Sequence, residues 1–273
     1  MLNPQWWTPE RCAALEARDE TAYRTDVLGE FADPEQGLLS PVAVHRSTRE
    51  SPLELVPVRG ARYSAAVDPS EGGAAGNGFS LVIVQYVAPR LISERGKYRV
   101  AFSQDFRGLG PEASWKEIAA VCSRYWLDVA VTDAYAAAAN SDLAKRYGLR
   151  LSVDKATAST KLEDYTTFAT LVHSDAIEFA PDRAMRRDLL SIKRRATQTG
   201  STIVLPRTTD GRHCDFASAL VAAVKHAKSS DNADAYSRMR ARSGAMPKAN
   251  DFMGPPPTPR HRDAADRRNR NSF

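Results

Sequence analysis

The sequence has few of the features that mark secreted, membrane or zinc-binding proteins. Its three cysteines (Cys12, Cys122 and Cys214) are far apart and form no CxxC pair. A disulfide framework or a zinc site is therefore not expected, and a reducing compartment fits best. No apolar run approaches the roughly 20 residues of a membrane span, and the first residues lack the basic and apolar regions of a signal peptide. We expect a protein of the cytoplasm.

The sequence also lacks the GxxxxGK[ST] loop that binds nucleotide phosphates. The nearest fragment, Gly96-Lys97, is followed by Tyr98 and has Leu91 in the place of the first glycine. The glycine-rich stretch 72–78 contains no lysine and is expected to be a turn. We therefore expect no ATPase activity from this chain.

What is present is the composition of a soluble globular protein. The 273 residues are 42% hydrophobic, which is enough for one good-sized core with some chain left over. Lysine and arginine exceed aspartate and glutamate by 38 to 33, a formal net charge of +5. An excess of this size permits binding to nucleic acid but does not require it.

Composition divides the chain into three regions. Residues 1–60 are predicted to be a helical leader and linker, with an extended, proline-rich connector over residues 40–60. Residues 61–228 alternate strand and helix signals and are predicted to be the folded domain. Residues 229–273 are rich in proline and arginine, and this composition predicts a disordered basic tail.

The middle region predicts an α/β domain with a mixed sheet flanked by helices. Strand signals fall at residues 63–67, 79–87, 98–106, 129–132, 149–153 and 202–205, and helix signals at 114–125, 136–147, 161–173, 182–194 and 215–227. The first three strands are joined by short connections, which favour an antiparallel meander. The later strands alternate with helices, as parallel strands do.

Three aspartates fall where such a sheet would hold a ligand. Asp68 follows the first strand, Asp133 follows the fourth, and Asp215 opens the last helix. In an open α/β sheet the ligand lies at the carboxyl ends of the strands. If the first and fourth strands are parallel neighbours, Asp68 and Asp133 lie side by side. Adjacent carboxylates repel, so they are tolerated mainly when a cation sits between them.

Carboxylates are hard oxygen ligands, which select Mg²⁺ or Mn²⁺ over zinc. Three of them can hold two such ions about 3.5–4 Å apart, an arrangement that activates water and stabilises the leaving oxygen of a phosphodiester. Taken singly, Asp68 also fits a simple strand end before Pro69, and Asp215 a simple helix cap. The order of all three favours the metal site.

This order of elements and aspartates resembles the ribonuclease H-like nuclease superfamily and, more closely, the C-terminal nuclease domain of tailed-phage terminase large subunits. The resemblance covers about residues 8–227. The segments that carry it are Val67-Asp68-Pro69, Val131-Thr132-Asp133-Ala134, residues 213–220 (HCDFASAL) and the leader 23–31 (YRTDVLGEF).

The resemblance implies that Asp68, Asp133 and Asp215 are the catalytic, metal-binding residues of an endonuclease. Its substrate would be concatemeric double-stranded viral DNA, cut during genome packaging in the host cytoplasm. The implied partners are DNA, the terminase ATPase region, the small terminase subunit and the portal protein. Residues 1–60 would then follow an ATPase region that this chain does not contain.

The third motif departs from the family pattern. Many family members carry a doubled acid there, whereas Cys214 precedes Asp215 in this chain. Asp210 is a reserve candidate for the missing ligand, although a turn position is the more ordinary reading. His213 is a candidate for assisting proton transfer, and a structural role in the turn is its alternative.

Basic residues near the later elements are candidates for contacts with DNA phosphates. Lys155 and Lys161 follow the fifth strand. Spacing places Arg183, Arg186, Arg187 and Arg194 on one face of a predicted helix, and a solvated helix face explains them equally well.

Two alternatives stay open. Another nuclease of the same fold, such as a junction resolvase, fits the same three aspartates. A catalytically silent DNA-binding or docking module of the packaging motor fits the fold but leaves the carboxylates structural.

Overall fold

The structure, a computed structural model, describes residues 6–18, 23–29, 35–69, 78–89, 96–197, 200–207 and 213–243, with side chains up to residue 229 in the last range. The chain divides into two units, residues 1–230 and residues 231–273. Near the N-terminus lie α1 (Pro9–Arg18) and the short π-helix η1 (Tyr23–Val27). Among the described ranges, no helix is long and apolar enough to cross a membrane.

A six-stranded mixed sheet forms the centre of the first unit. Its strand order is β6-β5-β2-β3-β4-β7. The strands are β2 (Arg62–Asp68), β3 (Phe79–Val87), β4 (Lys97–Phe106), β5 (Val129–Thr132), β6 (Arg150–Val153) and β7 (Ile177–Glu178). The predicted meander is confirmed, because β2, β3 and β4 pair antiparallel, while β5 pairs parallel with both β2 and β6. The predicted fold class, a mixed sheet flanked by helices, is likewise confirmed.

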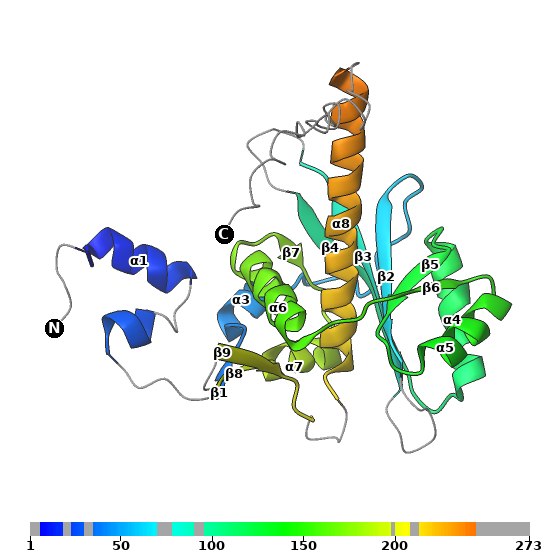
Figure 1. The fold of residues 1–273 in the computed structure, drawn as a ribbon, viewed down its shortest axis with the longest axis horizontal. Helices are drawn as coiled ribbons and strands as arrows, with labels where there is room; N and C mark the ends of the chain where they lie inside the picture. Colours follow the sequence, from blue (N-terminus) through cyan, green and yellow to red (C-terminus); the bar gives the residue numbers. More distant parts are fainter. Residues whose placement is uncertain are drawn as a thin grey trace, which may run out of the picture. The chain divides into compact units, whose positions relative to one another are not determined.

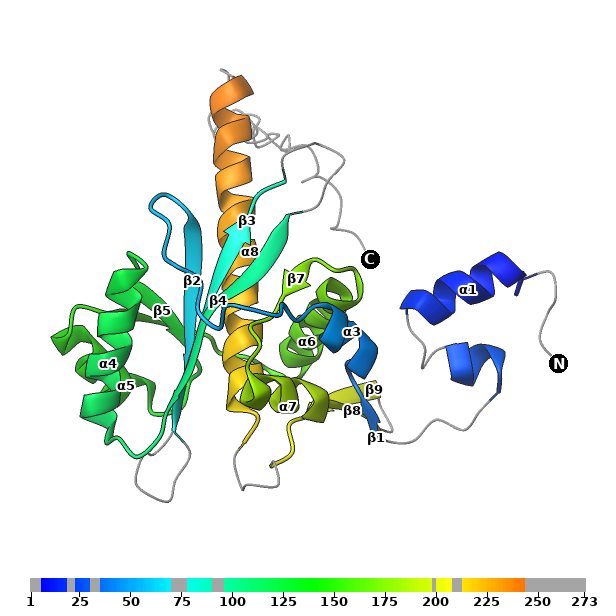
Figure 2. The ribbon, with the colours of Figure 1, turned by 180° about the vertical axis from the view of Figure 1, so that it is seen from behind.

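Both faces of the sheet are covered by helices (Figures 1 and 2). Side chains alternate along the strands: Val82 and Val84 of β3 belong to one apolar cluster, and Leu81 and Ile83 belong to the other. The first cluster includes residues of α6 (Ala158–His173) and α8 (Asp215–Ser243), and the second includes residues of α4 (Pro111–Arg124) and α5 (Ala137–Arg146). Burial on both faces explains the continuous apolar run of β3.

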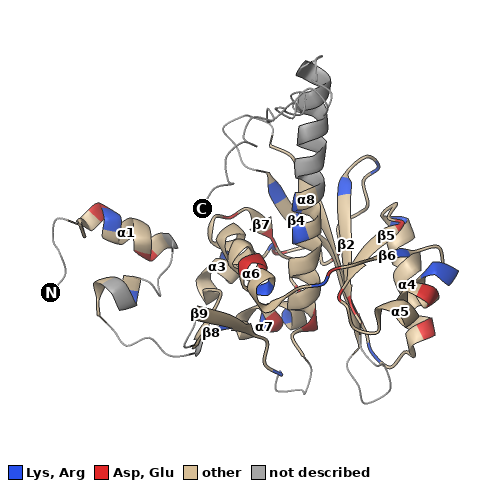
Figure 3. Ribbon diagram, viewed as in Figure 1, with Lys and Arg blue, Asp and Glu red and all other residues tan. Residues whose placement is uncertain are grey.

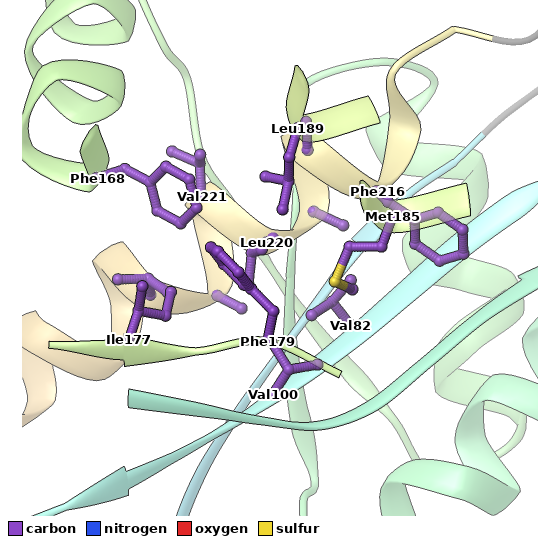
Figure 4. Packing of buried hydrophobic residues seen from close by; sticks show 14 of the residues in the cluster. Val82, Val100, Phe168, Ile177, Phe179, Met185, Leu189, Phe216, Leu220 and Val221 are labelled. Atoms are coloured by element: carbon purple, nitrogen blue, oxygen red, sulfur yellow. The ribbon is translucent and has the colours of Figure 1, made fainter. Parts of the chain in front are cut away.

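The start of α8 packs into the larger cluster. Phe216 and Leu220 are one helical turn apart, and both are almost fully buried beside Val82 of β3. Figure 4 shows these side chains together with those of α6 and of α7 (Arg183–Ser191). This packing fixes the first turn of α8, which carries Asp215.

The extended connector predicted for residues 40–60 is wrong in part. Residues Pro41–Arg46 form the helix α3, which begins after Ser40 with proline in its first turn. Ala43 and Val44 of α3 are buried in the larger cluster, so this segment is part of the domain. A proline-rich stretch favours an extended connector, but Pro41 lies in the first turn of α3, where a helix tolerates proline.

The helix predicted over residues 182–194 is too long. It ends at Ser191, and Lys193–Thr197 form β8, which pairs with β1 (Glu35–Gly37) and β9 (Gly200–Val204) in a separate three-stranded sheet. Pairing with these distant strands overrides a local helical pattern, and Arg194 consequently lies on a strand. The strand predicted at residues 202–205 is confirmed as part of β9.

The last helix is longer than predicted. The sequence predicts a helix that ends at Ala227 and a disordered tail from residue 229, but α8 continues to Ser243. Residues 229–243 lack a strong apolar stripe, which is the signal used to predict helices. The remainder of the predicted tail, residues 244–273, lies outside the described residues.

Candidate active site

The strand register brings Asp68 and Asp133 to the same edge of the sheet. β2 and β5 run parallel, and Val67 is the register partner of Thr132. The next residue on each strand is an aspartate, so Asp68 and Asp133 follow adjacent positions at the carboxyl ends of neighbouring strands. This is the edge at which open α/β sheets hold ligands.

Asp215 reaches this edge from the first turn of α8. It is only 7% exposed, and the turn around it is held by short backbone hydrogen bonds, including Asp215 N–H to the carbonyl of His213 at 2.8 Å. One turn further along α8, the hydroxyl of Ser218 favours the charged form of Asp68 and so acts to lower its pKa. The helix therefore supplies both a repelling carboxylate and a stabilising hydroxyl to Asp68.

A buried carboxylate on α7 caps the start of α8. Asp188 is fully buried, and its Oδ2 accepts a hydrogen bond from the backbone N–H of Phe216 at 3.1 Å. The first N–H groups of a helix have no partner within the helix, and the helix dipole favours a negative charge at that end. Asp188 thus stabilises the turn that carries Asp215.

The electrostatics single out Asp68 as the central carboxylate. Burial raises the pKa of Asp68 well above its ordinary value, and the negative charges of Asp215 and Asp133 raise it further. The hydroxyl of Ser218 and the positive charge of Lys161 act to lower this pKa. Burial also raises the pKa of Asp133, against the hydrogen bond that its Oδ1 accepts from the N–H of Tyr135 at 3.0 Å. A bound cation would relieve both the desolvation and the repulsion at Asp68.

A pocket of about 590 Å³ opens beside Asp68 and Asp133, whereas Asp215 is not among its lining residues. It is lined by the ends of β2 and β5, by the loops that follow β5 and β6, and by residues of α6 and α8. The lining residues with polar or charged side chains are Asp68, Thr132, Asp133, Tyr135, Asp154, Lys155, Thr157, Lys161, Asp164, Tyr165, Ser218 and Lys225. The pocket is therefore a place where an anionic substrate would meet both carboxylates and lysines.

A lysine on α8 joins two further carboxylates on the pocket wall. The Nζ of Lys225 lies 2.7 Å from Oδ2 of Asp154, just after β6, and 2.8 Å from Oδ2 of Asp164 on α6. Partial burial opposes the charge of Lys225, but the two carboxylates outweigh it and raise the pKa of this lysine. The ammonium therefore stays charged at neutral pH and neutralises this part of the wall.

We expect Lys225→Met to lower the thermal unfolding midpoint by about 2–4 °C. The side chain of Lys225 is about one third exposed, so we take the two contacts together to contribute roughly 1 kcal/mol. The loss should shrink in high salt, which screens the two remaining carboxylates. Thermal unfolding at low and high salt tests this, with Lys228→Met, an exposed position on the same helix, as the control. Equal unfolding midpoints for Lys225→Met and Lys228→Met would contradict a stabilising role for the contacts of Lys225.

Within the residues that the structure describes, no three His, Cys, Asp or Glu side chains gather closely enough to hold a single metal ion. Asp68 instead interacts with Asp133 and with Asp215. If metal ions were bound here, Asp68, Asp133 and Asp215 would be the carboxylates available to hold them. The donor set is all oxygen and anionic, which fits Mg²⁺ or Mn²⁺.

The other predicted residues divide into two groups. Lys155 and Lys161 line the pocket, and Lys161 influences Asp68. Among the described residues, those of α7 and β8 do not line it, and Arg183, Arg186 and Arg187 are exposed on α7. Figure 3 shows that α7 carries both basic and acidic residues. The prediction that Arg194 shares the face of that helix is wrong, because Arg194 lies on β8.

The third motif is partly described. His213 is partly buried and precedes α8, where its carbonyl accepts the N–H of Asp215. Cys214 is buried in the larger apolar cluster, with its thiol 3.1 Å from the carbonyl of Pro206. Asp210 lies outside the described residues.

Sequence reasoning missed Asp154, Asp164, Lys225, Ser218 and Asp188. Asp154 follows β6 in the way that Asp133 follows β5, so the rule that selected Asp133 also points to Asp154. Asp188 has no such signal, because its role depends on the contact between α7 and α8.

The sequence matches no family description and no curated protein, but the fold matches solved structures. The large terminase nuclease from thermophilic phage G20c aligns with a TM-score of 0.53 over 69% of this chain and 97% of that chain, at 13% identity. The HK97 bacteriophage large terminase aligns with a TM-score of 0.54 at 12% identity, and there the alignment spans about half (51%) of the longer protein and 81% of this chain. The large terminase nuclease domain of Thermus phage P74-26 aligns with a TM-score of 0.50 at 15% identity.

Proposed function

Starting from the fold that this chain shares with phage large terminase nuclease domains, we propose that it is a metal-dependent DNA endonuclease. The observation that carries the proposal is the position of Asp68. It is a partly buried carboxylate at the carboxyl edge of the sheet, with the charges of Asp133 and Asp215 acting on it and a pocket in front. Asp68, Asp133 and Asp215 are the proposed catalytic and metal-binding residues.

The proposed cofactors are two Mg²⁺ or Mn²⁺ ions held by these three aspartates. Such ions supply Lewis-acid stabilisation of a phosphodiester and a nucleophile at neutral pH. One G20c nuclease structure of the same fold, with a TM-score of 0.51, was solved with bound magnesium. The all-oxygen donor set of this chain supports the same choice of metal.

The remaining pocket residues act by position and charge. The hydroxyl of Ser218 favours the charged form of Asp68, and the N–H of Tyr135 holds one oxygen of Asp133. Lys155 and Lys161 are proposed to contact the DNA phosphate that enters the pocket, because they add positive charge at its lining. Arg183, Arg186, Arg187 and Arg194 are proposed to contact more distant phosphates, and His213 and Asp210 to assist at the third motif.

The proposed substrate is concatemeric double-stranded viral DNA, cut during genome packaging in the host cytoplasm. Such a nuclease would work with a terminase ATPase region, a small terminase subunit and a portal protein. Phosphate contacts carry no sequence information, so little sequence preference is expected.

Cleavage of supercoiled plasmid, linear duplex and a four-way junction in Mn²⁺, with and without EDTA, tests the proposal. We expect EDTA-sensitive cutting of plasmid and linear duplex by the wild type and none by Asp133→Asn. Asp128→Asn is the matched control, because Asp128 precedes the same strand, is exposed and pairs with Arg150 at 2.6 Å. Strong preference for the junction would favour a resolvase, and DNA binding without any cleavage would favour a silent docking module.

A further inference from the structure

The turn that follows β5 holds Asp133 in a constrained backbone. The N–H of Tyr135 donates to Oδ1 of Asp133 at 3.0 Å. The next residue, Ala136, has φ 45° and ψ 30°, a left-handed conformation that is unfavourable for a residue with a Cβ atom. Such a conformation persists only when surrounding contacts enforce it.

Those contacts come from Asn140, in the first turn of α5. The side chain is buried, with 6% of the residue exposed. Its backbone N–H donates to the carbonyl of Ala136 at 3.0 Å, and its Nδ2 donates to the carbonyl of Tyr135 at 3.1 Å. Asn140 therefore holds the turn at two successive carbonyls.

Asn140 is itself fixed by α4. The indole Nε1 of Trp115 donates to Oδ1 of Asn140 at 3.0 Å. Trp115 is fully buried and stacks edge-to-face on Phe79 of β3, with ring centroids 5.5 Å apart. The side chains of Trp115 and Asn140 thus connect the apolar core of the domain to the turn beside Asp133.

The chemistry of the two partners determines which way the Asn140 amide points. An indole N–H only donates, and a backbone carbonyl only accepts. The amide oxygen must therefore face Trp115, and the amide nitrogen must face Tyr135. An aspartate at this position would place a carboxylate oxygen against the Tyr135 carbonyl, and a leucine would make neither hydrogen bond.

We propose that Asn140 is a positioning residue for Asp133. Its side chain links buried Trp115 to the turn, and the turn presents the Asp133 carboxylate at the edge of the pocket. The inference rests on the proposed function, in which Asp133 holds metal. Asn140 is not among the residues that line the pocket, whereas Tyr135 is, so the effect of Asn140 on the site passes through Tyr135.

The test compares Mn²⁺ binding by calorimetry in wild type, Asn140→Leu, Asn140→Asp and Asp133→Asn, with plasmid nicking measured over a range of Mn²⁺ concentrations. Loss of an orienting contact behind a metal ligand weakens metal binding by about 10- to 100-fold. We expect a loss of this size in Asn140→Leu and Asn140→Asp. High Mn²⁺ should restore most of the nicking rate in both, but not in Asp133→Asn.

Asp142→Asn, an exposed position on the same helix, is the control and should match wild type. If Asn140→Leu does not fold, Trp115→Phe removes the indole donor together with part of the buried ring and should show a weaker loss of Mn²⁺ affinity in the same direction. Wild-type Mn²⁺ affinity in the folded Asn140 variants, together with weakened binding in Asp133→Asn, would overturn the role of Asn140 and leave the proposed function intact. Wild-type binding and cleavage in Asp133→Asn would overturn both.

Discussion

Replacing Asp68 by asparagine is expected to abolish Mn²⁺-dependent cleavage and, at the same time, to make the metal-free protein more stable. Activity should fall by about 1000-fold or more, because the proposed site loses the carboxylate that interacts with both Asp133 and Asp215. Stability should rise because the variant buries a neutral amide in place of a carboxylate that is desolvated and repelled. Gains in stability at the cost of function are common at strained active sites.

The gain in stability should depend on pH. The pKa of Asp68 in the folded protein is raised above its ordinary value of 3.8. Ionisation of Asp68 therefore destabilises the wild type progressively as the pH rises from that value through the raised pKa. The advantage of Asp68→Asn should be small in acid, grow with pH and level off above the raised pKa.

Thermal unfolding in EDTA across this pH range measures the effect, and each kcal/mol gained raises the midpoint of a domain of this size by about 2–4 °C. Asp128→Asn should show no comparable gain that grows with pH, because Asp128 is exposed and paired with Arg150. A loss of stability in Asp68→Asn, or a gain that does not change with pH, would show that Asp68 is not an electrostatically strained carboxylate.

Asp188→Ala is expected to destabilise the protein by about 1–3 kcal/mol and to reduce cleavage. Asp188 is fully buried and caps the start of α8 through the N–H of Phe216. Removal of a helix cap typically costs about 1 kcal/mol, and leaving a buried N–H without its acceptor adds to this. Because Asp215 lies in the same turn of α8, loosening the turn should also lower the rate of nicking.

Asp188→Asn provides the comparison, since asparagine caps helices about as well as aspartate. It should recover much of the lost stability and most of the activity. Chemical denaturation of the two variants and the wild type measures this difference. If both variants were equally unstable, the charge of Asp188 rather than its hydrogen bond to Phe216 would be the important feature.

The fold of the central sheet was predictable because its strands follow local patterns. The runs at residues 63–67, 79–87 and 129–132 are apolar and end at turns or aspartates, and the short links between the first three favour a meander. The prediction that Asp68 and Asp133 lie at neighbouring strand ends needs one further assumption, that β2 and β5 are parallel neighbours. The register of the two strands confirms that assumption.

The parts that were not predictable depend on contacts between distant segments. Arg194 carries a helical pattern but pairs with Gln36 in a strand. Lys225 lies 71 residues from Asp154 in the sequence, and only the tertiary fold brings α8 to this residue, which follows β6. Asn140 shows no motif at all, because its importance lies in the two partners that the fold places around its amide.

The most direct test of the account is calorimetric titration of Mn²⁺ into the wild type and Asp68→Asn at neutral pH. If Asp68 is the shared ligand of a metal site, the wild type binds Mn²⁺ and the variant loses at least about 100-fold in affinity. Equal binding of Mn²⁺ by the two proteins would contradict a metal site built on Asp68.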